Sequence, residues 1–128
     1  SPVWFPKTLR WEHGQKELCF KVRNGYNAID LSECTLRTQM AGGGKYMGQM
    51  RNWQDVLISG APGETVDVTV PIWNERTQEV LDKGSPAICR CHLLDPKGFR
   101  AVTADIMVTP PEAREIEEAM PVGPDAVL

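Results

Sequence analysis

Alternating apolar and polar residues mark several segments of this chain as β-strands. The clearest segment is 66–72, in which every second residue is valine or isoleucine and aspartate, threonine and proline lie between them. A period of two places successive side chains on opposite faces of a strand, so one face is expected to be buried. Comparable patterns predict further strands at 18–22, 34–40, 53–59, 87–94 and 99–108.

Turn-forming residues separate these strands. The Asn-Gly pair at 24–25 ends the first strand, and the Asp-Pro-Lys-Gly run at 95–98 joins the last two strands into a hairpin. A helix over 74–83 is predicted between two strands, because Asn74 can cap it and Gly84 can end it. Six or so strands with one short helix favour an all-β fold, an antiparallel immunoglobulin-like β-sandwich.

Both ends of the chain depart from the strand pattern. Residues 1–12 combine prolines with aromatic residues, which predicts an extended N-terminal arm. Residues 109–112 have the spacing of a capping box with proline at the first helical position, so a short acidic helix is predicted to about residue 120. The predicted organisation is an N-terminal arm at 1–12, a β-sandwich at 13–108 and an acidic C-terminal arm at 109–128.

Composition and charge narrow the class of protein. A chain of 128 residues with 41% hydrophobic and 24% charged residues fits one ordinary globular domain. The net charge of -3 argues against a nucleic-acid binder, and no apolar run approaches the roughly 20 residues of a membrane helix. The N-terminus lacks the basic-then-apolar order of a signal peptide, and we expect Ser1 to follow removal of an initiator methionine.

The four cysteines are predicted to be reduced and buried. Cys89 and Cys91 are two residues apart in a predicted strand, so their side chains share a face and cannot easily bridge to one another. A single Cys-Arg-Cys in a strand is also a weak match to zinc-ligand spacing. A disulfide and, after it, a metal site are the alternatives. We predict no cofactor and no metal site.

The sequence offers little for catalysis. His92 is expected on the strand face opposite the two nearby cysteines, and His13 stands beside Gly14 in what resembles a turn. The glycine-rich run at 42–48 matches no phosphate-binding motif and is expected to form a mobile loop. We therefore predict a protein that is not an enzyme and has no catalytic residues.

Aromatic and apolar residues near the two ends are the candidate binding residues. Trp4, Phe5 and Trp11 either close the sandwich or anchor in a neighbouring subunit, as interface hot spots do. Val127 and Leu128 pose the same choice at the other terminus. We predict protein binding by all five residues, and we expect that deletion of residues 1–6 abolishes assembly but leaves the fold intact.

Parts of the sequence resemble the immunoglobulin-like structural domains of tailed bacteriophage virions. The resemblance lies in the Lys-Glu-Leu-Cys-Phe-Lys-Val run at 16–22 with its Asn-Gly turn, in Ala-Ile-Asp-Leu-Ser at 28–32, and in Leu-Asp-Lys-Gly at 81–84 before the final hairpin. It covers roughly residues 16–108. The glycine-rich insert, the cysteines and the two arms depart from the family pattern. The resemblance implies a structural role in the virus particle and transfers no catalytic residue.

The expected function is that of a non-enzymatic viral structural protein. We expect a capsid decoration or cement protein of the virion, assembled in the host cytoplasm, that binds capsid or other virion proteins as a homo-oligomer, with a trimer favoured. A head-tail, baseplate or tail component is the first alternative. The second is a carbohydrate-binding or adhesin module that uses Trp53, Trp73 or Tyr46, and a small hydrolase relying on His92 is the third. No nucleic-acid or membrane partner is predicted.

Overall fold

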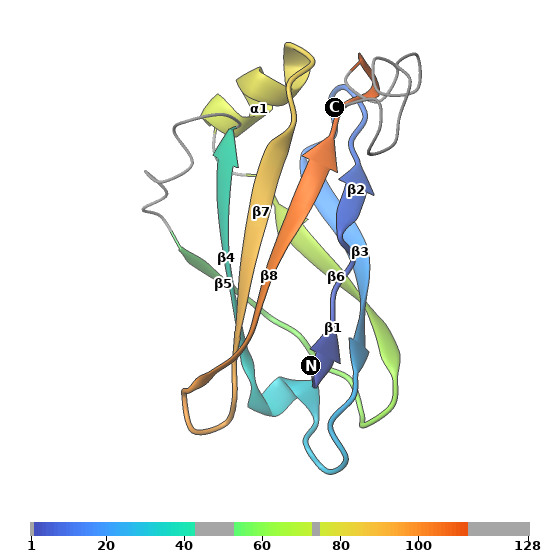
Figure 1. The fold of residues 1–128 in the computed structure, drawn as a ribbon, viewed down its shortest axis with the longest axis vertical. Helices are drawn as coiled ribbons and strands as arrows, with labels where there is room; N and C mark the ends of the chain where they lie inside the picture. Colours follow the sequence, from blue (N-terminus) through green and yellow to red (C-terminus); the bar gives the residue numbers. More distant parts are fainter. Residues whose placement is uncertain (1, 43–52, 73–74, 113–128) are drawn as a thin grey trace, which may run out of the picture.

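Two β-sheets form the protein, and a computed structural model describes them over residues 2–42, 53–72 and 75–112 (Figure 1). The smaller sheet has three strands in the order β1-β3-β6, and the larger has five in the order β2-β8-β7-β4-β5. The strands of the smaller sheet are β1 (Val3–Trp4), β3 (Glu17–Asn24) and β6 (Thr65–Pro71). Those of the larger sheet are β2 (Thr8–Arg10), β4 (Thr35–Gly42), β5 (Gln54–Val56), β7 (Ala87–Leu94) and β8 (Arg100–Thr109).

The order of the strands is that of an immunoglobulin-like sandwich, as predicted. The initial strand is divided between the two sheets: β1 pairs with β3, and β2 runs parallel to β8. The remaining pairings are antiparallel, with β3 beside β6 in one sheet and β8, β7, β4 and β5 side by side in the other. This division of strands between two sheets is the arrangement expected of immunoglobulin domains.

Alternating side chains from both sheets fill the core. Burial alternates residue by residue along β3 and β7, because each strand has one face against the opposite sheet. The buried cluster combines aliphatic residues with three cysteines, Cys34, Cys89 and Cys91. All cysteines are free thiols, and the Sγ atoms of Cys89 and Cys91 lie 3.9 Å apart. The prediction of burial is wrong for Cys19, which is exposed because it occupies an outward position of β3.

The residues predicted to form an N-terminal arm belong to the sandwich. Val3 pairs with Asn24, and Leu9 pairs with Val108 at the far edge of the larger sheet. Val3 is 1% exposed and Trp11 is completely buried. Strands of two and three residues are too short to show an alternating pattern, which is why the sequence suggested an arm.

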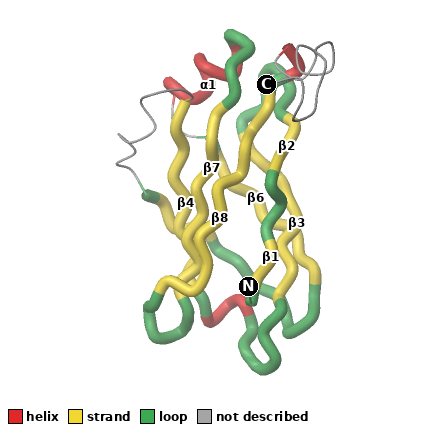
Figure 2. Tube along the Cα trace, viewed as in Figure 1, coloured by secondary structure: helices red, strands yellow, loops and turns green. Residues whose placement is uncertain are grey.

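Short helical elements lie at the two ends of the sandwich (Figure 2). Helix α1 (Glu75–Asp82) falls within the predicted range, whereas β5 is shorter than the predicted strand at 53–59. A 3-10 helix, η1 (Leu31–Glu33), was not predicted; the Asp30 side chain caps it, with Glu33 completing a capping box. No helix in the described part of the chain is long and apolar enough to span a membrane.

Several predictions concern residues outside the described ranges. They include most of the glycine-rich run, Tyr46, Trp73, and the two C-terminal anchors Val127 and Leu128. The acidic helix is described only at its beginning, where Pro111 and Glu112 are helical.

Candidate functional site

Two hollows lie on the outside of the sandwich, one associated with each sheet. The first, which we call the Trp4 surface, has a volume of about 350 Å³ and is located where β1 meets the end of β3. The residues that line it are Trp4, Arg23, Asn24, Gly25, Tyr26, Asn27, Pro62 and Gly63.

Strand pairing and a tight turn hold Trp4 in place. Trp4 is directly opposite Arg23 in the β1–β3 register, and the guanidinium carbon lies 5.3 Å from the centre of the indole ring, a cation–π contact. Gly25 donates its backbone N–H to the carbonyl of Pro2 at 2.6 Å. A Cβ atom on Gly25 would lie 2.3 Å from an indole carbon, so only glycine lets the ring pack on the turn.

The buried side chain of Asn24 fixes this turn from below. Its Nδ2 donates to the carbonyls of Ile29 and Gly60 at 2.8 Å and 3.0 Å, and its Oδ1 accepts the backbone N–H of Tyr26 at 2.9 Å. These bonds hold the loop that follows β3 together and join it to the segment at Gly60, which is 36 residues away. The Trp4 surface is therefore built on a backbone whose loop conformations are tied together.

The structure separates the three predicted N-terminal anchors. Trp4 is 50% exposed, whereas Phe5 packs on Phe20 with ring centroids 6.4 Å apart. Trp11 is completely buried, and its indole N–H donates to the carbonyl of Gln15 at 3.0 Å. Trp11 therefore closes the sandwich, which was the alternative interpretation, and cannot contact a partner in this fold. Phe5 is also packed against the core.

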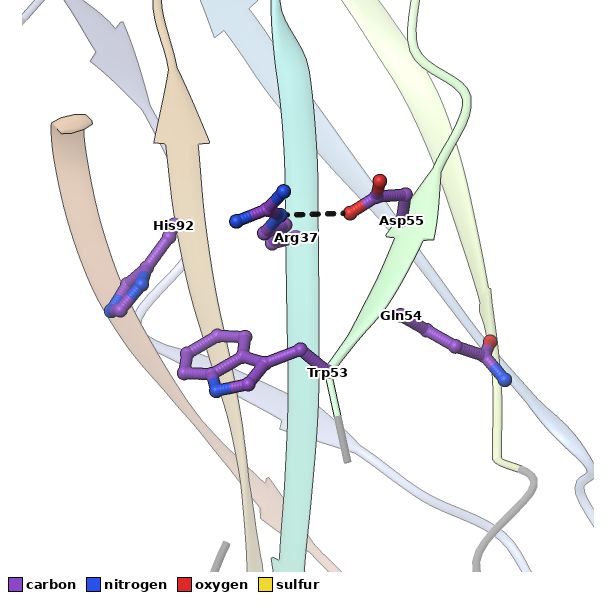
Figure 3. A pocket seen from close by; sticks show the side chains of 5 residues that line it. All are labelled: Arg37, Trp53, Gln54, Asp55 and His92. Carbon is purple, nitrogen blue, oxygen red and sulfur yellow. Dashed lines mark hydrogen bonds and ion pairs between the residues drawn. The ribbon is translucent and has the colours of Figure 1, made fainter. Parts of the chain in front are cut away.

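The second hollow, the sheet-face hollow, lies on the outer face of the five-stranded sheet (Figure 3). Its volume is about 510 Å³, and it is lined by Arg37, Trp53, Gln54, Asp55 and His92. The register places Arg37 opposite both Asp55 of β5 and His92 of β7, so these side chains form a row across three strands. Trp53 precedes β5 and packs on His92, with ring centroids 4.4 Å apart and an interplanar angle of 31°.

The two charged residues that line the sheet-face hollow, Arg37 and Asp55, balance one another. Arg37 donates from Nε to Oδ1 of Asp55 at 3.1 Å, and both side chains remain at least half exposed. In the next row of the same face, Arg90 makes two hydrogen bonds to Asp105, at 2.7 Å and 3.1 Å. Burial lowers the pKa of His92, and nearby arginines lower it further, so its imidazole is neutral at neutral pH. His92 also faces away from the two buried cysteines, as expected.

A third cluster joins distant parts of the chain at one end of the sandwich. Both ring nitrogens of His13 contact carboxylates: Nδ1 lies 3.3 Å from Asp82 at the end of α1, and Nε2 contacts Glu112 after β8. Hydrogen bonds to these carboxylates raise the pKa of His13. The partners are 69 and 99 residues away, so no local sequence signal indicates them. The described ranges contain no group of three or more His, Cys, Asp or Glu residues arranged to hold a metal ion.

Comparisons with known proteins give distant structural matches but no sequence match. Neither a protein-family model nor a curated protein matches the sequence. A solved structure, described as the crystal structure of calcium binding domain CBD12 of CALX1.1, is similar with 14% identity and a TM-score of 0.44. The match covers 86% of this chain and 46% of that chain, so this chain spans about half the length of that structure. The pairing of the strands defines the fold independently of this match.

Proposed function

We propose that this chain is a non-enzymatic structural protein that binds a partner protein through the Trp4 surface. The observation that carries the proposal is the gathering of Trp4, Arg23 and Tyr26 around one hollow. Tryptophan, tyrosine and arginine are the residue types that contribute most of the binding energy at protein interfaces. A half-exposed tryptophan on a folded domain also leaves apolar area for a partner to bury.

The rigid support of Trp4 favours binding. Binding is weakened when side chains or loops must become ordered at the interface, by about 0.5–1.5 kcal/mol for each side chain immobilised. The contacts with Arg23 and Gly25 already restrict the indole, and the hydrogen bonds of Asn24 restrict the turn beneath it. This preorganisation lets more of the contact energy appear as affinity.

The resemblance to phage virion domains supports a virion protein as the partner. Within the proposal the chain is a capsid decoration protein located in the virion, and a head-tail or baseplate component is the alternative. The same Trp4 surface is proposed to hold copies of this chain together, and the resulting homo-oligomer, with a trimer favoured, would multiply weak individual contacts with a repetitive virion surface. The resemblance alone supports this choice of partner.

The experiment that tests the proposal is a measurement of solution mass by light scattering behind size exclusion. The wild-type chain is expected to form a trimer or larger closed ring, and Trp4→Ala is expected to dissociate it. Trp53→Ala is the matched control, because it removes a partly exposed tryptophan from the other sheet. A Trp4→Ala chain that assembles like the wild type contradicts the proposal, and a wild-type chain that stays monomeric at high concentration contradicts the homo-oligomer.

Deletion of residues 1–6 is not a suitable test of this surface. The deletion removes Val3 from the core and Phe5 from its contact with Phe20, so it perturbs the fold together with the surface. The single substitution of Trp4 changes an exposed side chain and retains the β1–β3 pairing.

A further inference from the structure

We propose that the sheet-face hollow binds a neutral oligosaccharide, with Trp53 as a stacking platform and Arg37 and Asp55 as a hydrogen-bonding pair. This site goes beyond the proposed function, because it lies on the other sheet and uses no residue of the Trp4 surface. Its volume of about 510 Å³ falls within the range of small-molecule sites, roughly 300–1,000 Å³.

Trp53 provides the apolar platform. Trp53 is 38% exposed, and the His92 ring packs on its indole and restricts it (Figure 3). A pyranose ring has a face made largely of C–H groups, which packs on an indole and excludes water from both surfaces. An ordered and partly exposed indole is suited to this contact because little side-chain entropy remains to be lost.

Arg37 and Asp55 supply the polar half of the site. A sugar hydroxyl both donates and accepts hydrogen bonds, so a site that recognises it needs acceptors and donors side by side. Asp55 provides carboxylate acceptors and Arg37 provides N–H donors. Their mutual bond at 3.1 Å uses Nε of Arg37, and the two side chains are 50% and 61% exposed, so other polar atoms of both remain accessible. Figure 3 shows this bonded pair together with Trp53 among the side chains that line the hollow.

The charge balance favours a neutral ligand over an anionic one. Arg37 and Arg90 each pair with an aspartate on this face, and His92 is neutral at neutral pH. Arg100 also lies near His92 and lowers its pKa, but it does not line the hollow. An anionic ligand would have to compete with Asp55 for Arg37 and would meet two carboxylates nearby. A neutral polyol forms hydrogen bonds to both partners of an ion pair without separating them.

The test is a titration of the full chain with four oligosaccharides: cellohexaose, chitohexaose, maltohexaose and mannohexaose. Binding is followed by the indole N–H resonance of Trp53, assigned with Trp53→Phe, and by calorimetry. At least one sugar is expected to bind with an affinity that does not change with salt. Trp53→Ala and Asp55→Asn are each expected to weaken it by about tenfold or more, whereas Trp4→Ala is expected to bind as the wild type does.

Three results would overturn the inference. The first is the absence of any saturable shift of Trp53 with all four sugars up to about 10 mM, a concentration above the usual range of weak specific binding. The second is equal loss of affinity in Trp4→Ala and Trp53→Ala. The third is binding of a polyanion such as heparin, weakened by salt, in place of the neutral sugars. Because oligomeric mass is measured separately, failure of sugar binding leaves the proposal for the Trp4 surface untouched.

Discussion

The position of Val3 leads to a direct test of how the N-terminal residues contribute to stability. Val3 is 1% exposed and belongs to the core cluster. Val3→Ala removes two buried carbon atoms. At about 0.8 kcal/mol for each, the folded state loses about 1.6 kcal/mol of hydrophobic stabilisation. The cavity left behind adds a term on the order of 1 kcal/mol. The expected loss in free energy of unfolding is therefore about 2–3 kcal/mol.

Urea unfolding followed by circular dichroism measures this loss. With an m-value of about 1.5–2 kcal/mol per molar for a domain of this size, the midpoint should fall by about 1–2 M. Leu57→Ala is the control, because Leu57 is 98% exposed and its truncation should change stability by less than about 0.5 kcal/mol. A Val3→Ala midpoint within the error of the Leu57→Ala midpoint would refute the integration of β1 into the core and restore the interpretation of a free arm.

Three further predictions follow from side-chain contacts. Gly25→Ala should destabilise the chain by about 1–3 kcal/mol, because the new Cβ would lie 2.6 Å from the carbonyl oxygen of Pro2 and 2.3 Å from the indole ring; urea unfolding measures this loss. Gln39→Met should leave stability unchanged or raise it by about 1 kcal/mol, because the buried Nε2 of Gln39 has no hydrogen-bond partner among the residues that the structure describes; thermal unfolding is the assay. His13→Gln should lower the melting temperature near about pH 6 but not at alkaline pH, because only a protonated His13 donates to both Asp82 and Glu112.

The direction of the pH effect follows from the pKa shifts of His13 and Glu112. Because the folded pKa of His13 is raised, its stabilisation is fully present below the unfolded value of about 6.5 and is lost as the pH rises through the folded value. The pKa of Glu112 is lowered by His13, so its stabilisation is lost as the pH falls through that lowered value. A difference between wild type and His13→Gln that is constant across pH would count against the ion-pair explanation. A loss of stability above about 1 kcal/mol in Gln39→Met would contradict the packing described. An unchanged stability in Gly25→Ala would contradict it too.

The alternation of side chains was sufficient to predict most of the sandwich. Strands such as β6 and β7 are long enough for a period of two to be visible, and the turn at 95–98 identifies β8 as the hairpin partner of β7. The short strands β1 and β2 could not be predicted in this way. Their positions depend on pairing with β3 and β8, which lie far away in the sequence.

The candidate sites were harder to predict than the fold. Residue type alone could suggest Trp4 and Trp53 as binding residues, but not Arg23 or His92 as their supports, because those contacts arise from the register between strands. The prediction for Trp11 failed for the same reason. No sequence pattern around Trp11 indicates a partner. In the structure its backbone N–H donates a hydrogen bond to the carbonyl of Thr109, and its side chain is buried in the core.

The two proposed sites are compatible because of how a sandwich divides its surface. Trp4 and Arg23 are outward residues of the three-stranded sheet, and Arg37 and His92 are outward residues of the five-stranded sheet, so the core lies between the two pairs. A protein attached through the Trp4 surface would therefore present the sheet-face hollow away from its attachment partner. Light scattering and sugar titration on the same two variants test this division. Trp4→Ala should dissociate the oligomer and keep sugar binding, and Trp53→Ala should weaken sugar binding and keep the oligomer. Loss of both activities in either variant would show that the two surfaces are not independent.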